Sequence, residues 1–312
     1  MEFLKEVPNI RFMALRRWWY VLSALVVAGS IALVLFRGLN LTVDFTGGLV
    51  FELGFSRPVE LEDVRSALAA GGVEDFQVRT FGTASEVEVR LPPAGSGAAS
   101  EEAKAVLGSL AKVDPAVKLN RQESVGPQVS EQLGNQAALA VLMTLLLVLI
   151  YIAFRFRWRF GIGSLVASLH DPIVAVGAIA LLNIPFDLNV VAALLTILGY
   201  SVNDTVVIFD RIREILRRYK QMPVSEIIDL ATNQTLARTI MTSLTLLLAL
   251  GSLYVFGGTV IRSFTAAMIW GIIVATASSI FIGGPILIYF NIRPSALKAE
   301  KSDKKETTQA KA

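Results

Sequence analysis

The sequence predicts a polytopic α-helical membrane protein that carries one polar α+β domain between its first two spans. Of its 312 residues, 54% are hydrophobic and only 18% are charged, and the mean hydropathy is +0.58. Long apolar runs recur along the chain, and residues 37–135 form a single long polar stretch. This composition is too apolar for a water-soluble globule.

Six apolar stretches are long enough to cross a hydrocarbon core of about 30 Å, which takes about 20 helical residues. Residues 1–17 are basic and precede the first stretch without a convincing cleavage site, so we expect an uncleaved first span. The last span is long enough to tilt or to break near Gly283, Gly284 and Pro285. The expected spans are 18–36, 137–154, 162–182, 188–209, 236–256 and 264–289, the last five within a membrane region over 136–290.

Basic residues gather at alternate ends of these spans. Arg155, Arg157 and Arg159 follow the second span, and basic residues are frequent in 211–220 and 291–312, whereas 183–187 and 257–262 are nearly free of them. The positive-inside rule then places both termini in the cytoplasm and residues 37–135 outside. We expect the charged tail 291–312 to be disordered.

The polar stretch alternates between strand and helix patterns. Leu61, Val64 and Leu68 recur at helical spacing, and glycine or proline pairs punctuate the segments. The β-α-β-β-α-β order is that of the ferredoxin-like fold, which hosts many functions. The expected strands cover 41–55, 75–81, 86–91 and 117–123, and the helices cover 59–70 and 100–112.

Residues 211–235 follow the fourth span and show helical periodicity. Ile212, Ile215, Leu216 and Tyr219 share a face opposite arginines, which predicts an amphipathic helix at the membrane interface. Ser225 is positioned to cap a second short helix over 226–230.

Several chemistries are excluded by composition. The chain has no cysteine and one histidine, so we expect no metal site, and it has no Walker motif for ATP. The formal charge of +3 comes from basic residues at span ends, so we expect no nucleic-acid partner. We also expect no cofactor.

Asp204 is the main functional candidate, because it lies inside an apolar span. A carboxylate there costs about 2.5–3.5 kcal/mol on insertion scales, and such residues usually bind or move ions. Arg238 enters the next span from the same side and is positioned to pair with it. A carboxyl that alternates between paired and buried states takes up and releases a proton. The alternative is that Arg238 snorkels to headgroups and Asp204 packs against polar neighbours.

Small polar residues accompany both candidates. They either line a wet path or serve as helix-packing residues. They are Ser201, Asn203, Thr205, Thr239 and Thr242.

His170 and Asp171 precede Pro172, which should kink the third span. The pair either relays protons or packs by hydrogen bonding. Because adjacent helical residues point about 100° apart, we do not expect the two to interact as a triad. No serine is marked as a nucleophile with a histidine base, so we expect no enzyme.

The junction after the first span reads Asp44-Phe45-Thr46-Gly47-Gly48. Two consecutive glycines permit a tight turn or a close backbone approach, and we interpret Asp44, Gly47 and Gly48 as a structural junction.

Four segments together resemble the SecF family of bacterial protein-export membrane proteins. They are DFTGG at 44–48, LHDP at 169–172, FDLNVVAALLTILGYSVNDTVVIFDRIRE at 186–214 and NQTLARTIMTS at 233–243. The resemblance covers the whole chain except the tail.

The resemblance implies half of a pseudo-symmetric bundle of the resistance-nodulation-division type, with SecD as an obligate partner supplying the other half. It implies that Asp204 and Arg238 lie on a proton path, together with an aspartate of SecD. Proton flow would then help SecYEG release an unfolded preprotein at a late stage, after the SecA motor has acted, in the bacterial inner membrane. Because Met1 precedes the first span directly, a subunit separate from SecD is expected.

Two alternatives remain at this point. The chain is half of a lipid or drug exporter of the same superfamily, although such exporters usually carry larger outer domains. Otherwise it is a scaffold in the membrane that does not couple to protons, and such a scaffold should tolerate neutral replacements of Asp204 and Arg238.

Overall fold

The computed structural model describes residues 8–81, 83–93, 99–156, 158–290 and 292. The chain forms two compact units. The helical unit comprises Met1–Leu39, Val141–Ile184 and Asn189–Ala312, and the α+β unit comprises Asn40–Ala140 and Pro185–Leu188. Arg157 and the tail beyond residue 292 lie outside the described residues, so the expected disorder of the tail stays a prediction.

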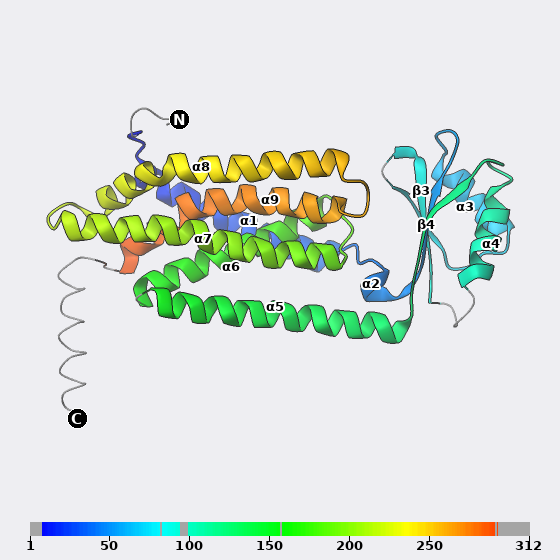
Figure 1. Cartoon of the computed structure of the whole chain (residues 1–312), viewed down its shortest axis with the longest axis horizontal. Helices are drawn as coiled ribbons and strands as arrows, with labels where there is room; N and C mark the ends of the chain where they lie inside the picture. Colours follow the sequence, from blue (N-terminus) through cyan, green and yellow to red (C-terminus); the bar gives the residue numbers. More distant parts are fainter. Residues whose placement is uncertain (1–7, 82, 94–98, 157, 291, 293–312) are drawn as a thin grey trace, which may run out of the picture. The chain divides into compact units, whose positions relative to one another are not determined.

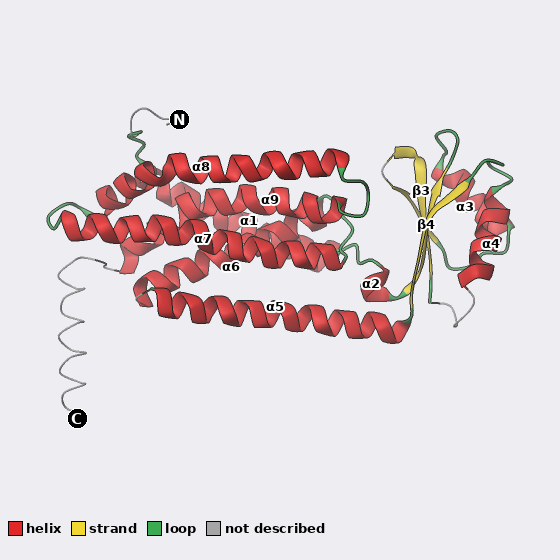
Figure 2. Ribbon diagram, viewed as in Figure 1, coloured by secondary structure: helices red, strands yellow, loops and turns green. Residues whose placement is uncertain are grey.

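The described residues contain six helices long and apolar enough to cross a membrane, as predicted. Helices α1, α6, α8 and α9 run alongside one another in the helical unit (Figures 1 and 2). The helices are α1 (Arg16–Arg37), α5 (Pro127–Arg155), α6 (Trp158–Leu181), α7 (Leu188–Arg218), α8 (Val224–Phe256) and α9 (Arg262–Ser278).

Small residues bring these helices close together. A Cβ atom added to Gly177 of α6 would lie 2.1 Å from Ser30 Oγ of α1, and one added to Gly271 of α9 would lie 2.1 Å from Ile197 Cδ1 of α7. Lipid tails are as apolar as leucine, so membrane helices associate through such close packing. These contacts fix the rotation of α6 and α7, and with it the direction of their polar side chains.

The last span breaks where the sequence predicts. After α9 the backbone forms one π-helical turn, η2 (Ser279–Gly283), then α10 (Gly284–Ile286) and the 3₁₀ turn η3 (Leu287–Phe290). Pro285 has no N–H for the regular helical ladder, which explains a local change of helix type.

The amphipathic helical pattern predicted within 211–235 is present over 211–218, but these residues continue α7 and their apolar face packs on protein instead of forming a separate interfacial helix. Helix α7 continues to Arg218, and Ile212 and Leu216 are 0% and 1% exposed. They pack with Ile228 of α8 and with Phe12 of the 3₁₀ turn η1 (Phe12–Leu15). The apolar stripe therefore faces protein, because periodicity alone does not distinguish a protein neighbour from lipid.

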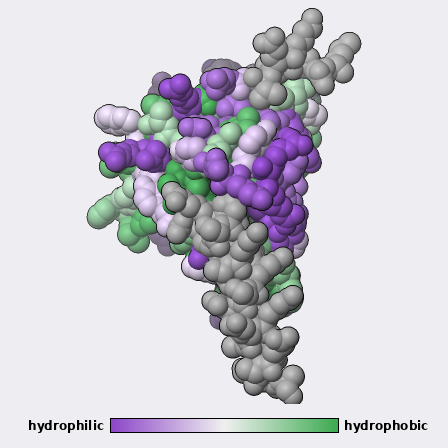
Figure 3. Space-filling model, turned by 90° about the vertical axis from the view of Figure 1, so that its left-hand side faces the viewer, coloured by the Kyte–Doolittle hydropathy of each residue, from purple (hydrophilic) through white to green (hydrophobic). Residues whose placement is uncertain are grey.

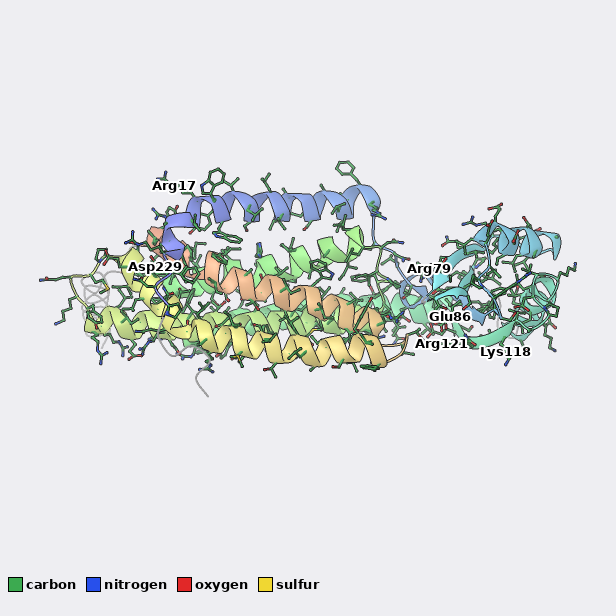
Figure 4. The ribbon with its side chains drawn as sticks, turned by 90° about the horizontal axis from the view of Figure 1, so that it is seen from above. Arg17, Arg79, Glu86, Lys118, Arg121 and Asp229 are labelled. Atoms are coloured by element: carbon green, nitrogen blue, oxygen red, sulfur yellow. The ribbon has the colours of Figure 1, made fainter. Side chains whose placement is uncertain are left out.

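Ser225 does not cap a second helix, since it lies inside the first turn of α8. The start of α8 is instead joined to the segment before α1. Asp229, labelled in Figure 4, accepts a hydrogen bond from Met13 N (2.9 Å). The Asn233 side chain bonds both the N–H and the carbonyl of Ile10 (3.0 and 2.8 Å).

The end of the helical unit at which α7 turns into α8 presents a largely hydrophilic surface (Figure 3). Five charged residues of α7 line a shallow groove there: Asp210, Arg213, Glu214, Arg217 and Arg218. Arg155, at the end of α5, forms an ion pair with Asp210.

The α+β unit has the predicted β-α-β-β-α-β order, with sheet order β2-β3-β1-β4 and antiparallel pairing throughout. This is the ferredoxin-like arrangement. Its elements are β1 (Gly48–Gly54), α3 (Leu61–Ala70), β2 (Gln77–Phe81), β3 (Thr83–Leu91), α4 (Ala99–Leu110) and β4 (Lys118–Val125).

The first strand starts later than predicted. Leu41 makes only an isolated parallel bridge with Phe186, and the short helix α2 (Val43–Thr46) precedes β1. The signal for extended chain at Leu41 is correct, but its partner lies 145 residues later in the sequence.

One face of the sheet packs on α3 and α4, with Phe51, Val64 and Val106 all 0% exposed. The opposite face carries charged residues, among which Arg79 and Arg121 are labelled in Figure 4. The Glu88 carboxylate of β3 accepts from Arg79 on the neighbouring strand β2 (2.8 Å) and from Arg90 on β3 itself (2.5 Å).

Candidate functional site

Polar side chains from α6 and α7 lie inside the helical unit. His170 and Asp171 come from α6, Ser201 and Asp204 from α7. Ser201 and Asp204 are three residues apart, so the helical repeat places them on one buried face of α7. The sequence predicted each of these residues as a candidate but not how they pair.

Asp171 is the centre of a hydrogen-bonded group in which both of its carboxylate oxygens have a partner. It is 0% exposed, His170 Nδ1 lies 3.0 Å from its Oδ1, and Ser201 Oγ donates to its Oδ2 over 2.5 Å. His170 and Asp171 therefore interact directly, although they form no triad in which the histidine lies between the aspartate and the serine. Rotation about the side-chain dihedral angles brings the imidazole and the carboxylate together, even though the Cα–Cβ bonds of adjacent helical residues diverge.

The order of this group is histidine to aspartate to serine. Ser201 bonds the carboxylate and has no hydrogen bond to His170, and the buried His170 Nε2 has no partner among the described residues. A Ser-His-Asp triad has the histidine between the serine and the aspartate, and this order does not supply that arrangement.

A second polar chain was missed in the sequence. Tyr200 OH lies 2.8 Å from Ser243 Oγ of α8, and Ser243 Oγ lies 2.7 Å from Thr276 Oγ1 of α9. The run Ala-Thr-Ala-Ser-Ser at 275–279 interrupts an apolar span and is the signal that marks Thr276. The chain joins three helices across the bundle.

Asp204 lies in different surroundings. It is only 4% exposed, yet its Oδ2 atom is buried and has no hydrogen-bond partner within the described part of the chain. The adjacent Thr205 hydroxyl is likewise buried and unpartnered. Buried polar atoms are bonded in the great majority of cases, so such an exception needs an explanation.

Arg238 does not close this gap. Its charge acts on Asp204 electrostatically, but neither residue forms an ion pair within 4.0 Å among the described residues. Arg238 is exposed, as is Asn203, the residue next to Asp204. The predicted direct ion pair between Asp204 and Arg238 is therefore absent among the described residues, although Arg238 is near enough for its charge to act on Asp204.

The exposed faces around Arg238 and Asn203 are small and polar. On α8 this face continues from Arg238 through Thr242 and Thr245 to Ala249 and Ser252, all exposed at helical spacing. On α7 the corresponding exposed residues are Ala192, Thr196, Gly199 and Asn203. Other exposed positions of α8, such as Leu244 and Leu248, carry large apolar side chains by contrast.

Thr242 bonds to its own helix, since its Oγ1 donates to the carbonyls of Arg238 and Thr239, at 3.0 Å each. Thr239 is 2% exposed, and its carbonyl also accepts from Ser243 Oγ (2.8 Å). The Thr242 hydroxyl is therefore satisfied within α8 and does not need a partner from another helix.

Asp44, Gly47 and Gly48 belong to the α+β unit. Gly47 and Gly48 have φ values of +68° and +119°, and a Cβ on Gly48 would lie 2.4 Å from the Leu91 carbonyl oxygen. Both positions therefore favour glycine. Asp44 Oδ2 accepts a hydrogen bond from the backbone N–H of Leu188 (3.0 Å), the first residue of α7.

Two carboxyl groups of the α+β unit have pKa values that are shifted in opposite directions. Burial raises the pKa of Glu123 above its ordinary value of 4.5, although Arg121 acts in the opposite direction. Hydrogen bonds from the Ser56 side chain and backbone, and from Ala116 N, lower the pKa of Asp114 below 3.8. Burial also lowers the pKa of the Arg90 guanidinium.

Six spans, a polar cluster within them and an inserted ferredoxin-like unit define a multi-pass membrane protein of the transport type. Residues 105–293 match the family described as protein export membrane protein SecD/SecF, C-terminal, and residues 32–59 match the SecD/SecF GG motif.

Similar proteins give the same assignment. The chain is 39% identical to protein translocase subunit SecF of Haemophilus influenzae, over 97% of this chain and 95% of that protein. It is 38% identical to the SecF subunit of Vibrio alginolyticus, over 97% and 96%. The chain belongs to the SecF family of protein translocase subunits.

Solved structures of SecDF share the fold. The crystal structure of SecDF from Thermus thermophilus, a translocon-associated membrane protein, matches with a TM-score of 0.83 and 36% identity over 93% of this chain. A structure of SecDF in a super-membrane-facing form matches with a TM-score of 0.68 and 37% identity over 94%. The chain spans 40% of the length of each SecDF chain.

Proposed function

We propose that this subunit works with a SecD partner as a proton-driven accessory to the Sec translocase. Protons moving through the site at Asp204 and Arg238 would promote late, SecA-independent passage of an unfolded preprotein through SecYEG. The unbonded, buried Oδ2 atom of Asp204 carries the proposal.

An unbonded carboxylate oxygen is unfavourable unless it is protonated, hydrated or paired in another state. Asp204 lies next to the exposed Asn203, and the charge of Arg238 acts on it, so a modest movement of α7 or α8 would change its partners. A carboxyl that changes partners changes its proton affinity. Proton uptake and release at Asp204 is therefore the chemistry that this geometry supports best.

The exposed small and polar faces of α7 and α8 support a membrane-embedded partner. Residues such as Gly199 and Thr245 allow close helix approach, and exposed polar groups gain hydrogen bonds across an interface. Arg238 at a lipid-facing position would be unfavourable. Membership of the SecF family and similarity to SecDF favour SecD as this partner, with the two proteins forming one bundle.

The energy available is sufficient for such a device. One elementary charge crossing about 100 mV releases roughly 2.3 kcal/mol. A conformational equilibrium with a gap of a few kcal/mol is shifted substantially by that amount.

For orientation, we propose that both termini are cytoplasmic in the bacterial inner membrane and that the α+β unit lies outside. Arg155, Arg213, Arg217 and Arg218 lie at the ends of α5 and α7, which favours the cytoplasm on that side. We propose no enzymatic activity, since the Ser201 hydroxyl bonds the Asp171 carboxylate and not a histidine, as a Ser-His-Asp triad would require.

The test replaces Asp204 with asparagine in the co-expressed SecD/SecF pair. Asp210→Asn is the matched control, because it makes the same change on the same helix at a surface ion pair. We expect Asp204→Asn to remove the part of preprotein export into membrane vesicles that depends on a proton gradient, while assembly stays normal. Asp210→Asn should retain it.

If Asp204→Asn keeps full gradient dependence, Asp204 is not on the coupling path. The scaffold alternative then becomes the better account, in which the subunit holds the complex together without coupling to protons.

A further inference from the structure

An apolar groove lies between α5, α6 and α7 within the helical unit. Its volume is about 320 Å³, and among the described residues it is lined by seven leucines, one valine and Ser168. Leu146 comes from α5, Leu165 from α6 and Leu198 from α7. The Ser168 hydroxyl already donates to the Ser164 carbonyl (2.8 Å). The lining therefore suits an apolar occupant.

The size of the groove fits a hydrocarbon chain. An apolar cavity of about 150 Å³ holds one benzene ring, so this groove holds on the order of a dozen carbon atoms. A helix with its side chains is about 10–12 Å wide, and two turns of it occupy roughly 1,000 Å³, which is too much for the groove. The lining residues Leu142 and Leu149 are 63% and 41% exposed, so the groove is open to the surrounding bilayer.

The groove also lies at the depth of an acyl chain below a headgroup. Along α5, Leu149 and Leu142 are about 9 and 20 Å from Arg155, at about 1.5 Å per residue. Along α6, Leu165 is about 9 Å from Arg159. Half of the hydrocarbon core is about 15 Å thick. A lipid with an acyl chain in the groove therefore has its phosphate near the turn between α5 and α6.

This turn lies at a basic end of the helical unit. Arg159 Cζ lies 5.4 Å from the ring centroid of Trp158, which is 55% exposed. Arg155 pairs with Asp210, and Asp210 also pairs with Arg213 (3.4 Å). Three arginines against one carboxylate leave a formal charge of +2 here. The N–H groups in the first turn of α6 further favour an anion.

We propose that the groove and the basic turn together form a binding site for one anionic phospholipid. Its acyl chain lies in the groove, and its phosphate lies at Arg155 and Arg159. Leaving a bilayer gives an acyl chain no hydrophobic gain, since lipid tails are as apolar as leucine. The charges therefore supply the preference over zwitterionic lipids, as in other basic pockets between membrane helices. The site does not depend on the proposed proton function.

The charge requirement is tested with the purified SecD/SecF complex in vesicles of equal phosphatidylglycerol and phosphatidylcholine content. After extraction in detergent, native mass spectrometry counts the retained lipids, and we expect one phosphatidylglycerol to be retained in preference. Arg155→Gln with Arg159→Gln should weaken this preference about 25-fold, or about fivefold for each charge removed. Arg217→Gln with Arg218→Gln is the matched control, because it removes two exposed charges from the end of α7, outside the groove.

The control should change the preference less than about twofold. Equal losses in the two double variants would overturn the site, since they would mean a general attraction of anionic lipid to basic residues.

The position of the acyl chain is tested on the unchanged protein, so that no variant has to fold. Phosphatidylglycerol and phosphatidylcholine that carry a diazirine in one acyl chain are photolysed in separate vesicle samples of the complex. We expect the phosphatidylglycerol probe to label Leu146 and Leu165 more strongly than the phosphatidylcholine probe does. Leu147 is the internal control, because it is 60% exposed on α5 and does not line the groove.

Leu147 should be labelled equally by the two probes. The same ratio of labelling at Leu146, Leu165 and Leu147 would overturn the proposal. A groove that neither probe labels, as when a SecD helix covers it, would also overturn it.

Discussion

Asp171 and Asp204 are both buried in the membrane helices, but their surroundings differ. Asp171 has a partner on each oxygen, at 3.0 Å from His170 and 2.5 Å from Ser201. Asp204 has a buried oxygen without a partner and an arginine that does not reach it. The first arrangement stabilises one conformation, whereas the second leaves a group that gains partners in another state. Burial of a carboxylate is therefore not sufficient to mark a functional site; its hydrogen bonds have to be counted.

The largest expected effect is a difference in the stability of the folded protein between the alanine variants of Asp171 and Asp204. Asp171→Ala leaves the Ser201 hydroxyl and the His170 ring without their partner in a buried place, and should destabilise the folded protein by roughly 2–5 kcal/mol. Asp204→Ala removes an unsatisfied group and should cost less than about 1 kcal/mol. Thermal unfolding of both purified variants in detergent measures the difference. Similar losses for the two variants would remove the distinction.

A smaller effect extends the same contrast to glycines. Gly177→Ala should destabilise the subunit by about 1–3 kcal/mol, because its Cβ would lie 2.1 Å from Ser30 Oγ. Gly199→Ala meets no atom within 4 Å and should leave the subunit's stability unchanged. Thermal unfolding measures both. Copurification with SecD adds a second readout, in which Gly199→Leu should weaken assembly if the small face of α7 is the partner surface.

The next effect isolates one hydrogen bond of the Asp171 group. Ser201→Ala removes the donor to Asp171 Oδ2 and should cost about 1–2 kcal/mol. Ser164→Ala is the matched control on α6, since its hydroxyl is also buried but has no partner among the described residues. Denaturation of both variants under one condition gives the comparison. A loss no larger than that of the control would mean that the short contact contributes nothing to stability.

The smallest effect concerns two carboxyl groups of the α+β unit whose pKa values are shifted in opposite directions: hydrogen bonds lower the pKa of Asp114, whereas burial raises that of Glu123 despite its ion pair with Arg121. The pKa of Glu123 is raised by burial, so the folded state binds its proton more tightly than the unfolded state does. Its contribution is present below about the ordinary value of 4.5 and is lost as pH rises through the raised pKa. The pKa of Asp114 is lowered, so its contribution is present above 3.8 and is lost as pH falls through the lowered pKa.

Glu123→Gln should therefore gain stability relative to wild type as pH rises above 4.5. Asp114→Asn should lose stability relative to wild type above 3.8 and approach it in acid. Hydrogen exchange of β1 amides in the whole protein, compared with wild type at each pH, reads both changes. Parallel pH profiles for the two variants would contradict the assigned causes.

The sequence by itself determined the six spans, the break near Gly283 and the β-α-β-β-α-β order. The length of an apolar run, the position of a proline and the periodicity of residues are local properties, so they can be read from the sequence without knowing which segments pack together. It also singled out Asp204, because an ionisable residue in an apolar run is recognisable from composition alone.

Only the tertiary structure decided how the polar residues are partnered. The contact of Asp171 with Ser201 depends on the rotation and depth of α6 and α7, which close contacts such as Gly177 with Ser30 establish. The bond from Leu188 N to Asp44, and the burial of Ile212 and Leu216, join segments far apart in the chain. Helical periodicity specifies which residues share a face, but the packing of the whole bundle decides what that face meets.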